Sequence, residues 1–443
     1  MPLALPLVIS FWLRSAFAWV DTIFASFLHD ETYGAIGDAS IAAIGLTLPL
    51  DFLLTALWVG TSNGVTARLA AAIGAGRGEE VEQIKKATVK IIFGLAAFAL
   101  VIAWFIWSFA DRIGLDSVVA GQFKIYATVM MLGSALTSFW SILPDSIVKA
   151  HYDTRSTMWA GLCSSVTNLV LNAFFLFVLE WGIFGIAFST VLGRIAGLLY
   201  ASSRARRHED KRRQDIKQNT PGLSSSPVRS ILLIAIPSSV TFVLMGVESL
   251  AVNGILKNTS EAVSNLAAWS LFDRTTRFLI MPIIAAGVAL LPLVARLQGE
   301  KRFKAIGFEL LSGVKLSALY ATLIVFPLVL FFGDLIAITL TDASTTQQAA
   351  IQLMHFVPIA VFVIAPFILT RATFDGLQRP RPGLAAAFLR TFLFVIPFVW
   401  YGSKYASYFG MTQIEAIAFG YLLGLSLGSL AFWLFARRKV ILQ

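Results

Sequence analysis

The chain has 443 residues, of which 57% are hydrophobic and only 14% are charged, and its mean hydropathy is +0.77. Soluble globular proteins carry roughly 25% charged residues, so the composition excludes an ordinary soluble protein and indicates one that faces hydrocarbon. The net charge of +10 does not indicate nucleic-acid binding, because the basic residues lie in loops between apolar runs, where they act as topology signals.

Twelve apolar runs follow one another along the chain, each long enough to cross a bilayer at about 20 residues per span. The first run is too long for the apolar region of a signal peptide, so we interpret it as a span. The sequence predicts an all-α membrane protein with about twelve transmembrane helices. They are expected at residues 3–28, 41–70, 84–110, 119–147, 157–179, 183–203, 229–256, 264–294, 305–332, 349–374, 383–407 and 412–436.

A basic segment divides these spans into two sets. The stretch from Ser202 to Arg229 carries eight Lys and Arg residues and almost no large apolar ones. We therefore predict an N-terminal lobe of six spans at 1–203, a solvated basic linker at 204–228 and a C-terminal lobe of six spans at 229–443.

The loops differ sharply in charge. One set of alternate loops, the linker included, holds 25 Lys and Arg residues, whereas the other set holds three. The positive-inside rule then predicts that the linker and both termini are cytoplasmic, in a cell membrane and specifically a bacterial inner membrane. An even number of spans per lobe gives both lobes the same orientation, as in parallel internal repeats.

Several segments of the first half recur in the second. The run IAAIGLTLPL at 41–50 is echoed at 262–271, GRGEEVEQI at 76–84 at 298–306, and AHYDTRSTM at 150–158 at 376–384. Pro6 and Pro237 also correspond, and the offsets all lie between about 221 and 231. Matching segments in the same order indicate an internal duplication.

Polar residues within apolar spans are the first candidates for function, because a charge in the bilayer core costs roughly 2.5–3.5 kcal/mol on insertion scales. Asp21 in span 1 can exchange a proton or bind Na⁺, or it can be a structural hydrogen-bond acceptor. Arg14 lies seven residues earlier on the same helical face, and either acts on Asp21 or pairs elsewhere. Asn168 and Asn172 share one face of span 5, where they can bind a carboxylate or join helices. Asn63 adds a polar group to the same half.

The second half offers fewer candidates. Glu248 in span 7 is a possible second protonatable site, and Asp273 and Arg274 are each expected to have a partner of their own. His355 is expected to be packed and hydrogen-bonded. Three further charged residues are expected to form pairs inside their lobes: Asp51, Arg194 and Arg390.

Two enzyme signatures, H-E-x-x-H and G-x-x-x-x-G-K-[ST], are missing from the sequence. Without a phosphate-binding loop, transport would draw on an ion gradient. The single cysteine, Cys163, excludes an intrachain disulfide and a multi-cysteine metal site. We expect no enzymatic activity, no metal and no cofactor.

The order LP…WVDT, AAIGLTLPL, GAGRGEE, AHYDTRSTM and TNLVLN…GIFGIAFSTV resembles the multidrug and toxic compound extrusion (MATE) family over nearly the whole chain. The resemblance implies an antiporter of two six-helix lobes that exports amphipathic, usually cationic, compounds in exchange for H⁺ or Na⁺. It assigns Asp21 and Asn168 to the cation-coupling site of the DinF-type branch. Asn172 stands where several members have a second aspartate, and the C-lobe carboxylates of the NorM-type branch are incomplete here, since Glu248 lies one turn beyond the usual place.

The sequence therefore predicts a proton-coupled exporter whose cation-coupling residues are Asp21, Asn168 and Asn172, with Glu248, Arg14 and Asn63 as secondary candidates. Its expected partners are a small-molecule substrate, H⁺ or Na⁺, and the lipid bilayer, with no nucleic acid, and it is expected to work as a monomer. A lipid-linked-sugar flippase and an organic-acid exporter of the same superfamily stay open as alternatives.

Overall fold

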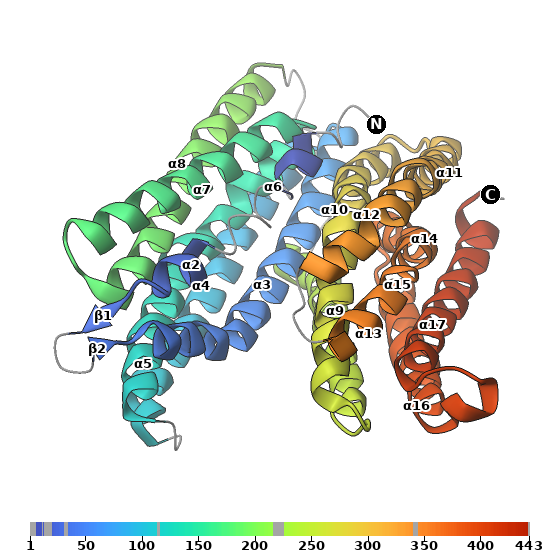
Figure 1. Ribbon diagram of the computed structural model, residues 1–443. Coiled ribbons are helices and arrows are strands. Elements are labelled where there is room, and N and C mark those ends of the chain that lie inside the picture. Colours follow the sequence, from blue (N-terminus) through green and yellow to red (C-terminus); the bar gives the residue numbers. More distant parts are fainter. Residues whose placement is uncertain are drawn as a thin grey trace. The chain divides into compact units, whose positions relative to one another are not determined.

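The computed structural model describes residues 6–10, 12, 20–30, 34–112, 116–215, 226–339 and 344–441, and nearly all of them are helical (Figure 1). The chain forms two compact units, Pro2–Ser239 and Val240–Gln443. In the described part of the chain, eleven helices are long and apolar enough to cross a membrane. The first predicted span, 3–28, is described only in part, and its residues 6–10, 12 and 20–25 are helical.

The N-terminal unit is built from long helices and one ladder of two-residue antiparallel strands, in which His29 pairs with Ala35. Asp116 and Asp153 begin α5 and α7 as N-caps, since their carboxylates accept backbone N–H groups of the first turn. The elements are α2 Val20–Ala25, β1 His29–Asp30, β2 Gly34–Ala35, α3 Gly37–Gly74, α4 Gly78–Phe109, η1 Ala110–Arg112, α5 Ser117–Gly133, η2 Ser134–Ser138, η3 Phe139–Ser141, α6 Ile142–Ala150, α7 Thr154–Phe177 and α8 Gly182–Asp215.

Helix α9, Pro227–Leu256, opens the second half of the chain, and the C-terminal unit includes it from Val240 onwards. A capping box between Thr412 and Glu415 begins α17. The remaining elements are α10 Ala262–Gly299, α11 Phe303–Tyr320, η4 Ala321–Val325, α12 Phe326–Thr339, α13 Ser344–Met354, α14 Val357–Gly376, α15 Arg381–Phe388, η5 Leu389–Val395, α16 Ile396–Tyr405, η6 Ala406–Phe409, α17 Gln413–Ala436 and η7 Arg437–Ile441.

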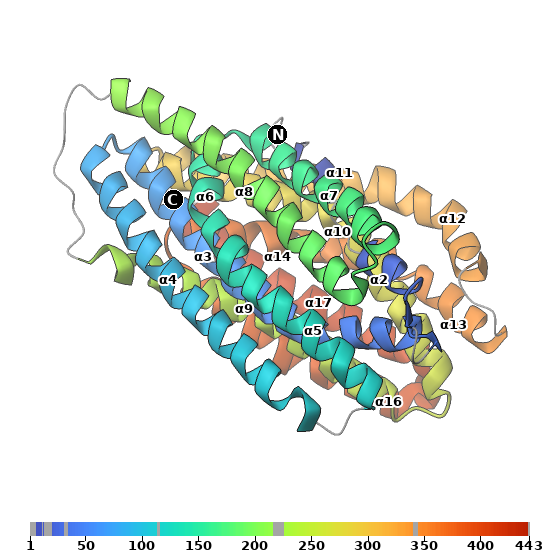
Figure 2. The same cartoon turned by 90° about the vertical axis from the view of Figure 1, so that its left-hand side faces the viewer.

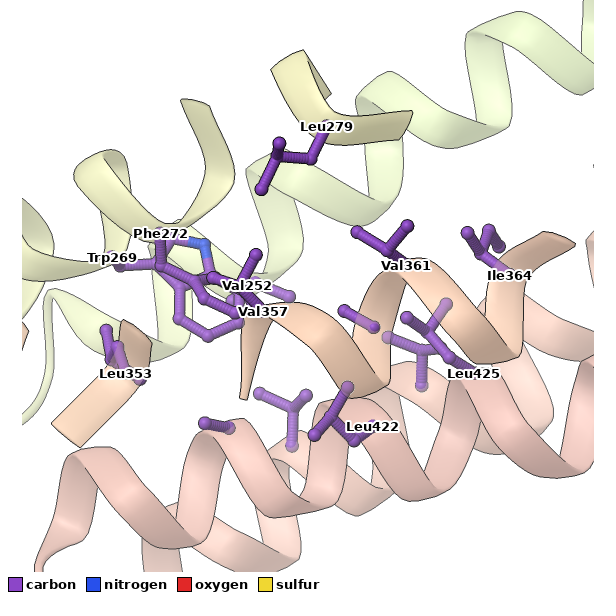
Figure 3. Packing of buried hydrophobic residues seen from close by; sticks show 14 of the residues in the cluster. Val252, Trp269, Phe272, Leu279, Leu353, Val357, Val361, Ile364, Leu422 and Leu425 are labelled. Atoms are coloured by element: carbon purple, nitrogen blue, oxygen red, sulfur yellow. The ribbon is translucent and has the colours of Figure 1, made fainter. Parts of the chain in front are cut away.

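The C-terminal unit has its own apolar core. Trp269 and Phe272 of α10 pack together with Val357 of α14 and Leu422 of α17, as the close-up shows (Figure 3). These side chains are at most 5% exposed. Burial of a large apolar side chain contributes roughly 1.5–3 kcal/mol, and in this unit it fixes the helices that carry the polar residues discussed below.

Matching turns in the two halves reveal the internal repeat. Three pairs of turn residues have a positive φ: Gly76 (69°) with Lys301 (61°), Tyr152 (63°) with Gln378 (58°), and Glu180 (55°) with Gly410 (64°). The members of each pair lie 225, 226 and 230 residues apart. A left-handed residue just past a helix end is a common way to stop a helix, and its recurrence at the same offsets shows that the two halves turn at equivalent places.

Helix α8 continues into the segment that we predicted as a solvated linker. Residues 204–215 are helical, and ion pairs with α4 explain this difference. Arg212 lies 2.7 Å from Glu82 and 2.9 Å from Glu209, and Lys85 lies 2.7 Å from Glu209. Glu209 and Arg212 of this stretch are therefore paired with α4 charges, while other charged residues here, such as Arg207 and Lys211, are exposed. Figure 2 shows α8 running alongside α7 before the grey trace begins.

The turn between α6 and α7 holds the same extension of α8. His208 Nε2 lies 2.9 Å from Asp153 Oδ2, and Arg204 Nε donates to Ser156 Oγ at 2.9 Å. Burial opposes ionisation of Asp153, but hydrogen bonds from Ser156 and His208 outweigh it and lower the pKa of this carboxyl to about 2. The turn and α8 are thus joined by charged hydrogen bonds at the end of the helix.

Candidate functional site

The Asp21 carboxylate on α2 accepts four side-chain hydrogen bonds. Asn172 and Asn168 donate their Nδ2 groups to Oδ1 at 3.1 and 3.4 Å. Thr190 Oγ1 and Tyr126 OH donate to Oδ2 at 2.8 and 3.0 Å. The five residues come from α2, α5, α7 and α8, so one carboxylate connects four helices of the N-terminal unit.

Close packing of α7 against α8 places the two asparagines. A Cβ at Gly193 would lie 2.6 Å from Ser164 O and 3.0 Å from Asn168 Cβ, and one at Gly197 would lie 2.9 Å from Ala160 O. Glycines four residues apart let membrane helices approach closely. The approach also lets the Asn168 amide donate to Thr190 Oγ1 at 2.8 Å, so the partners of Asp21 bind one another as well.

The four partners of Asp21 among the described residues are all neutral. The ion pairs formed by the described residues do not include Asp21. Arg194 of α8 and Asp21 both lie within electrostatic reach of Asp51 on α3. The Arg194 side chain itself donates a hydrogen bond from Nη1 to Ser134 Oγ at 3.0 Å. Neutral donors can stabilise an ionised carboxylate without cancelling its charge, and taking up a proton removes that charge.

The structure brings three of the predicted site residues together: Asp21, Asn168 and Asn172. Asn63 lies on α3, and its side chain forms none of the hydrogen bonds made to Asp21. Arg14 lies outside the described residues.

Sequence reasoning missed Tyr126 and Thr190. Tyr126 is 3% exposed in an apolar helix, and Thr190 stands in the run GIAFSTVLG. The buried hydroxyl of a tyrosine nearly always needs a partner, and that requirement was the signal available for Tyr126.

The second carboxylate candidate, Glu248, lies in the C-terminal unit and has a charged partner. Its Oε2 accepts from Arg390 Nη2 at 3.0 Å and from Thr391 Oγ1 at 2.8 Å. Arg390 therefore forms the pair within its own lobe that the sequence predicted. Asp273 likewise has a partner, Arg277, at 2.7 Å.

The expectation that His355 is packed was wrong. Its side chain is 61% exposed and lies 3.6 Å from the equally exposed Asp334. The predicted span 349–374 is interrupted here, since α13 ends at Met354 and α14 begins at Val357. The histidine therefore sits at a helix break and not inside an apolar span.

No metal cluster is evident in the part of the chain that the structure describes, since no three or more His, Cys, Asp or Glu side chains gather there. The Asp21 site offers one carboxylate, two amides and two hydroxyls, which suits a monovalent cation or a proton better than a divalent metal.

The MatE family model matches residues 6–174 and again residues 237–401. The chain therefore belongs to this family of multidrug efflux transporters. Two matches, one in each half, agree with the repeated turns and confirm the internal duplication predicted from the sequence. The protein is a multi-pass membrane transporter with the family's all-α architecture of two six-helix lobes.

Two bacterial relatives match most of the chain. The probable multidrug resistance protein YoeA of Bacillus subtilis is 20% identical over 321 residues, which cover 71% of this chain and 68% of YoeA. The multidrug export protein MepA of Staphylococcus aureus is 23% identical over 299 residues, which cover 67% of this chain but only 63% of MepA.

Solved structures share the fold. An outward-facing multidrug resistance MATE-family transporter superposes with a TM-score of 0.87 at 20% identity, covering 99% of this chain and 94% of that one. A mutant of the Vibrio cholerae MATE transporter VcmN gives 0.86 at 21% identity, covering 100% and 97%.

Proposed function

We propose that the protein is a secondary active antiporter that exports amphipathic, cationic drugs or metabolites in exchange for H⁺. The observation that carries this proposal is the Asp21 carboxylate at the junction of four helices, whose partners among the described residues are all neutral donors. Membership of a multidrug efflux family supports the substrate class, and the relatives YoeA and MepA carry multidrug names.

Protonation of Asp21 is the step that moves the helices. The charged carboxylate attracts a cationic substrate and holds α2 against α5, α7 and α8. A proton from the outer side neutralises it, which weakens four charge-assisted hydrogen bonds at once and frees α2 to rearrange as substrate leaves. Loss of that proton to the cytoplasm restores the bonds and completes a cycle of alternating access.

The donor set favours H⁺ over Na⁺. A sodium ion is bound best by several oxygen atoms, but Oδ1 of Asp21 faces two NH₂ groups, which repel a cation. A proton needs only one acceptor. The buried Oδ1 atom of Asn172 has no hydrogen-bond partner. Rotation of the Asn172 amide by about 180° would turn this oxygen toward Asp21, where it could accept a hydrogen bond from the protonated acid.

We extend the proposal to topology. Both termini and the linker lie on the cytoplasmic side of a bacterial inner membrane, because basic residues concentrate on that set of loops. A single chain contains both lobes, so the transporter works as a monomer. The division into lobes at 1–203 and 229–443 is part of this proposal.

The two alternatives draw less support. A flippase for lipid-linked sugars calls for arginines free to bind anionic head groups, whereas Arg194 donates to Ser134 and Arg390 pairs with Glu248. An organic-acid exporter would likewise need a cationic site, and the Asp21 site is anionic.

Dye efflux from proteoliposomes tests the function. Efflux of a cationic dye is measured under a pH gradient without Na⁺ and under a Na⁺ gradient at equal pH. We expect efflux to follow the pH gradient alone, to vanish in Asp21→Asn and to persist in Asp334→Asn, a variant of an exposed carboxylate. Efflux driven by Na⁺, or competition by anions in place of cations, would contradict the proposal.

A further inference from the structure

The C-terminal unit contains a buried carboxylate that already has a cation. Glu248 on α9 is 5% exposed, and its Oε2 accepts from Arg390 at 3.0 Å and from Thr391 at 2.8 Å. Arg390 itself is 2% exposed. A buried ion pair of this kind is stable only when both partners stay in place, because removing one leaves an uncompensated charge.

The surrounding helices hold the Arg390 side chain in position. Its guanidinium carbon lies 4.4 Å from the centre of the Phe367 ring on α14, a cation–π contact. On the other side is Gly428 of α17, where an added Cβ would lie 2.5 Å from Arg390 Cγ. Arg390 and Thr391 belong to the π-helix η5, a rare conformation often found at functional sites. These contacts therefore hold the Arg390 guanidinium in place beside Glu248.

Glu248 and Asp21 lie in comparable parts of the two halves, since Asp21 is on α2, which precedes α3, and Glu248 is on α9, which precedes α10. They lie 227 residues apart, between the offset of 231 that relates the ends of α2 and α9 and the offset of 225 that relates the starts of α3 and α10. The N-terminal carboxylate binds two amides and two hydroxyls, whereas the C-terminal one binds a guanidinium and a hydroxyl. Among the described residues, the carboxylate of the N-terminal half has neutral partners, whereas the carboxylate of the C-terminal half has a charged one, the Arg390 guanidinium.

We infer that Arg390 is a built-in counter-cation, which occupies the place of an exchangeable monovalent cation at Glu248 and leaves Asp21 as the exchanging carboxylate. Arg390 is then a specificity-determining residue. It prevents Na⁺ from binding at Glu248. The charge of the C-terminal site then stays constant, whereas the charge of the Asp21 site changes during transport. Asp273 on α10 also has a cationic partner, Arg277, at 2.7 Å, but both of these side chains are partly exposed. This inference rests on the proposed function, but it concerns the binding of Na⁺ at Glu248, which can be measured without any transport.

The test is a titration of the purified protein with Na⁺, using choline as the ionic-strength control. It is done at about pH 9, because alkaline pH favours the charged form of a carboxylate. The variants are Arg390→Met, Glu248→Gln and the double variant, each in the wild-type and in the Asp21→Asn background. Binding at Asp21 would survive Glu248→Gln and vanish in Asp21→Asn, so the two sites are told apart.

We expect no Glu248-dependent Na⁺ binding in the wild type and a new site for about one Na⁺ in Arg390→Met, lost again in the double variant. If Arg390→Met does not fold, Arg390→Gln keeps a hydrogen-bond donor for Glu248 and replaces it in the titration. Na⁺ binding to the wild type that Glu248→Gln removes would overturn the inference. So would folded Arg390→Met or Arg390→Gln proteins that bind no Na⁺.

Discussion

Asn172 donates its amide to Asp21 Oδ1 at 3.1 Å, while its own Oδ1 atom is buried and has no hydrogen-bond partner. A buried acceptor without a donor is costly, at about 1–3 kcal/mol, and calls for an explanation. A proton on Asp21 supplies one, because the neutral acid becomes a donor. The pair of side chains is therefore suited to both protonation states of the site.

The first prediction concerns Asn172→Asp. Two carboxylates about 3 Å apart cannot both ionise readily, so we expect proton uptake by the pair at a pH higher by one unit or more, roughly. The pH dependence of tryptophan fluorescence or of substrate binding measures this shift. Asn63→Asp, on α3, is the matched control. An equal shift in that control would contradict the assignment of Asn172 to the site.

Tyr126→Phe removes one donor from the ionised carboxylate while keeping the ring. Hydrogen bonds to charged groups contribute about 1.5–3 kcal/mol, and one pH unit corresponds to about 1.4 kcal/mol. The charged form of Asp21 loses stability, so half-maximal transport should move upward by about one pH unit. Tyr320→Phe, whose hydroxyl donates to Leu279 O in the other unit, should leave the profile unchanged. An unchanged profile in Tyr126→Phe would show that this hydroxyl does not act on the site.

Gly193→Ala tests the packing that positions the asparagines. The new Cβ would lie 2.6 Å from Ser164 O, and overpacking of this kind costs typically 1–3 kcal/mol. We expect a lower thermal midpoint in detergent and weaker transport. Gly94→Ala is the control, since nothing lies within 4 Å of its added Cβ and alanine favours the helix. Equal midpoints for the two variants would argue against close contact of α7 and α8.

Asp153 makes stability depend on pH. Its pKa is lowered to about 2 against an ordinary value of 3.8, so its contribution is fully present above about pH 4 and is lost as the pH falls through about 2. Asp153→Asn should be less stable than the wild type at neutral pH. The two should converge near pH 2 in thermal unfolding followed by circular dichroism. A constant difference down to that pH would mean that the carboxylate charge is not responsible.

Much of the architecture could be predicted from the sequence, because long apolar runs report directly on membrane spans. The duplication was visible in echoes such as those at 41–50 and 262–271, and the double family match confirms it. Asp21, Asn168 and Asn172 were likewise found because polar groups are conspicuous in apolar helices.

Other features depend on contacts between distant helices. Thr190 of α8 donates to Asp21, which lies 169 residues earlier on α2, and a single threonine in an apolar run gives no signal of such a contact. The many charged residues of 204–215 predicted a solvated linker. In the structure Arg212 pairs with Glu82, which lies 130 residues earlier in the chain. Pairing at that separation cannot be inferred from local composition.

The most direct test of the central claim is proton release on substrate binding. A cationic substrate is added to purified protein in weakly buffered detergent solution, and the pH change is recorded for the wild type and for Asp21→Asn. If the substrate and a proton compete for Asp21, the wild type should release about one proton per bound substrate at saturation, and Asp21→Asn should release none. Equal release from both proteins would show that another group exchanges the proton and would contradict the proposed mechanism.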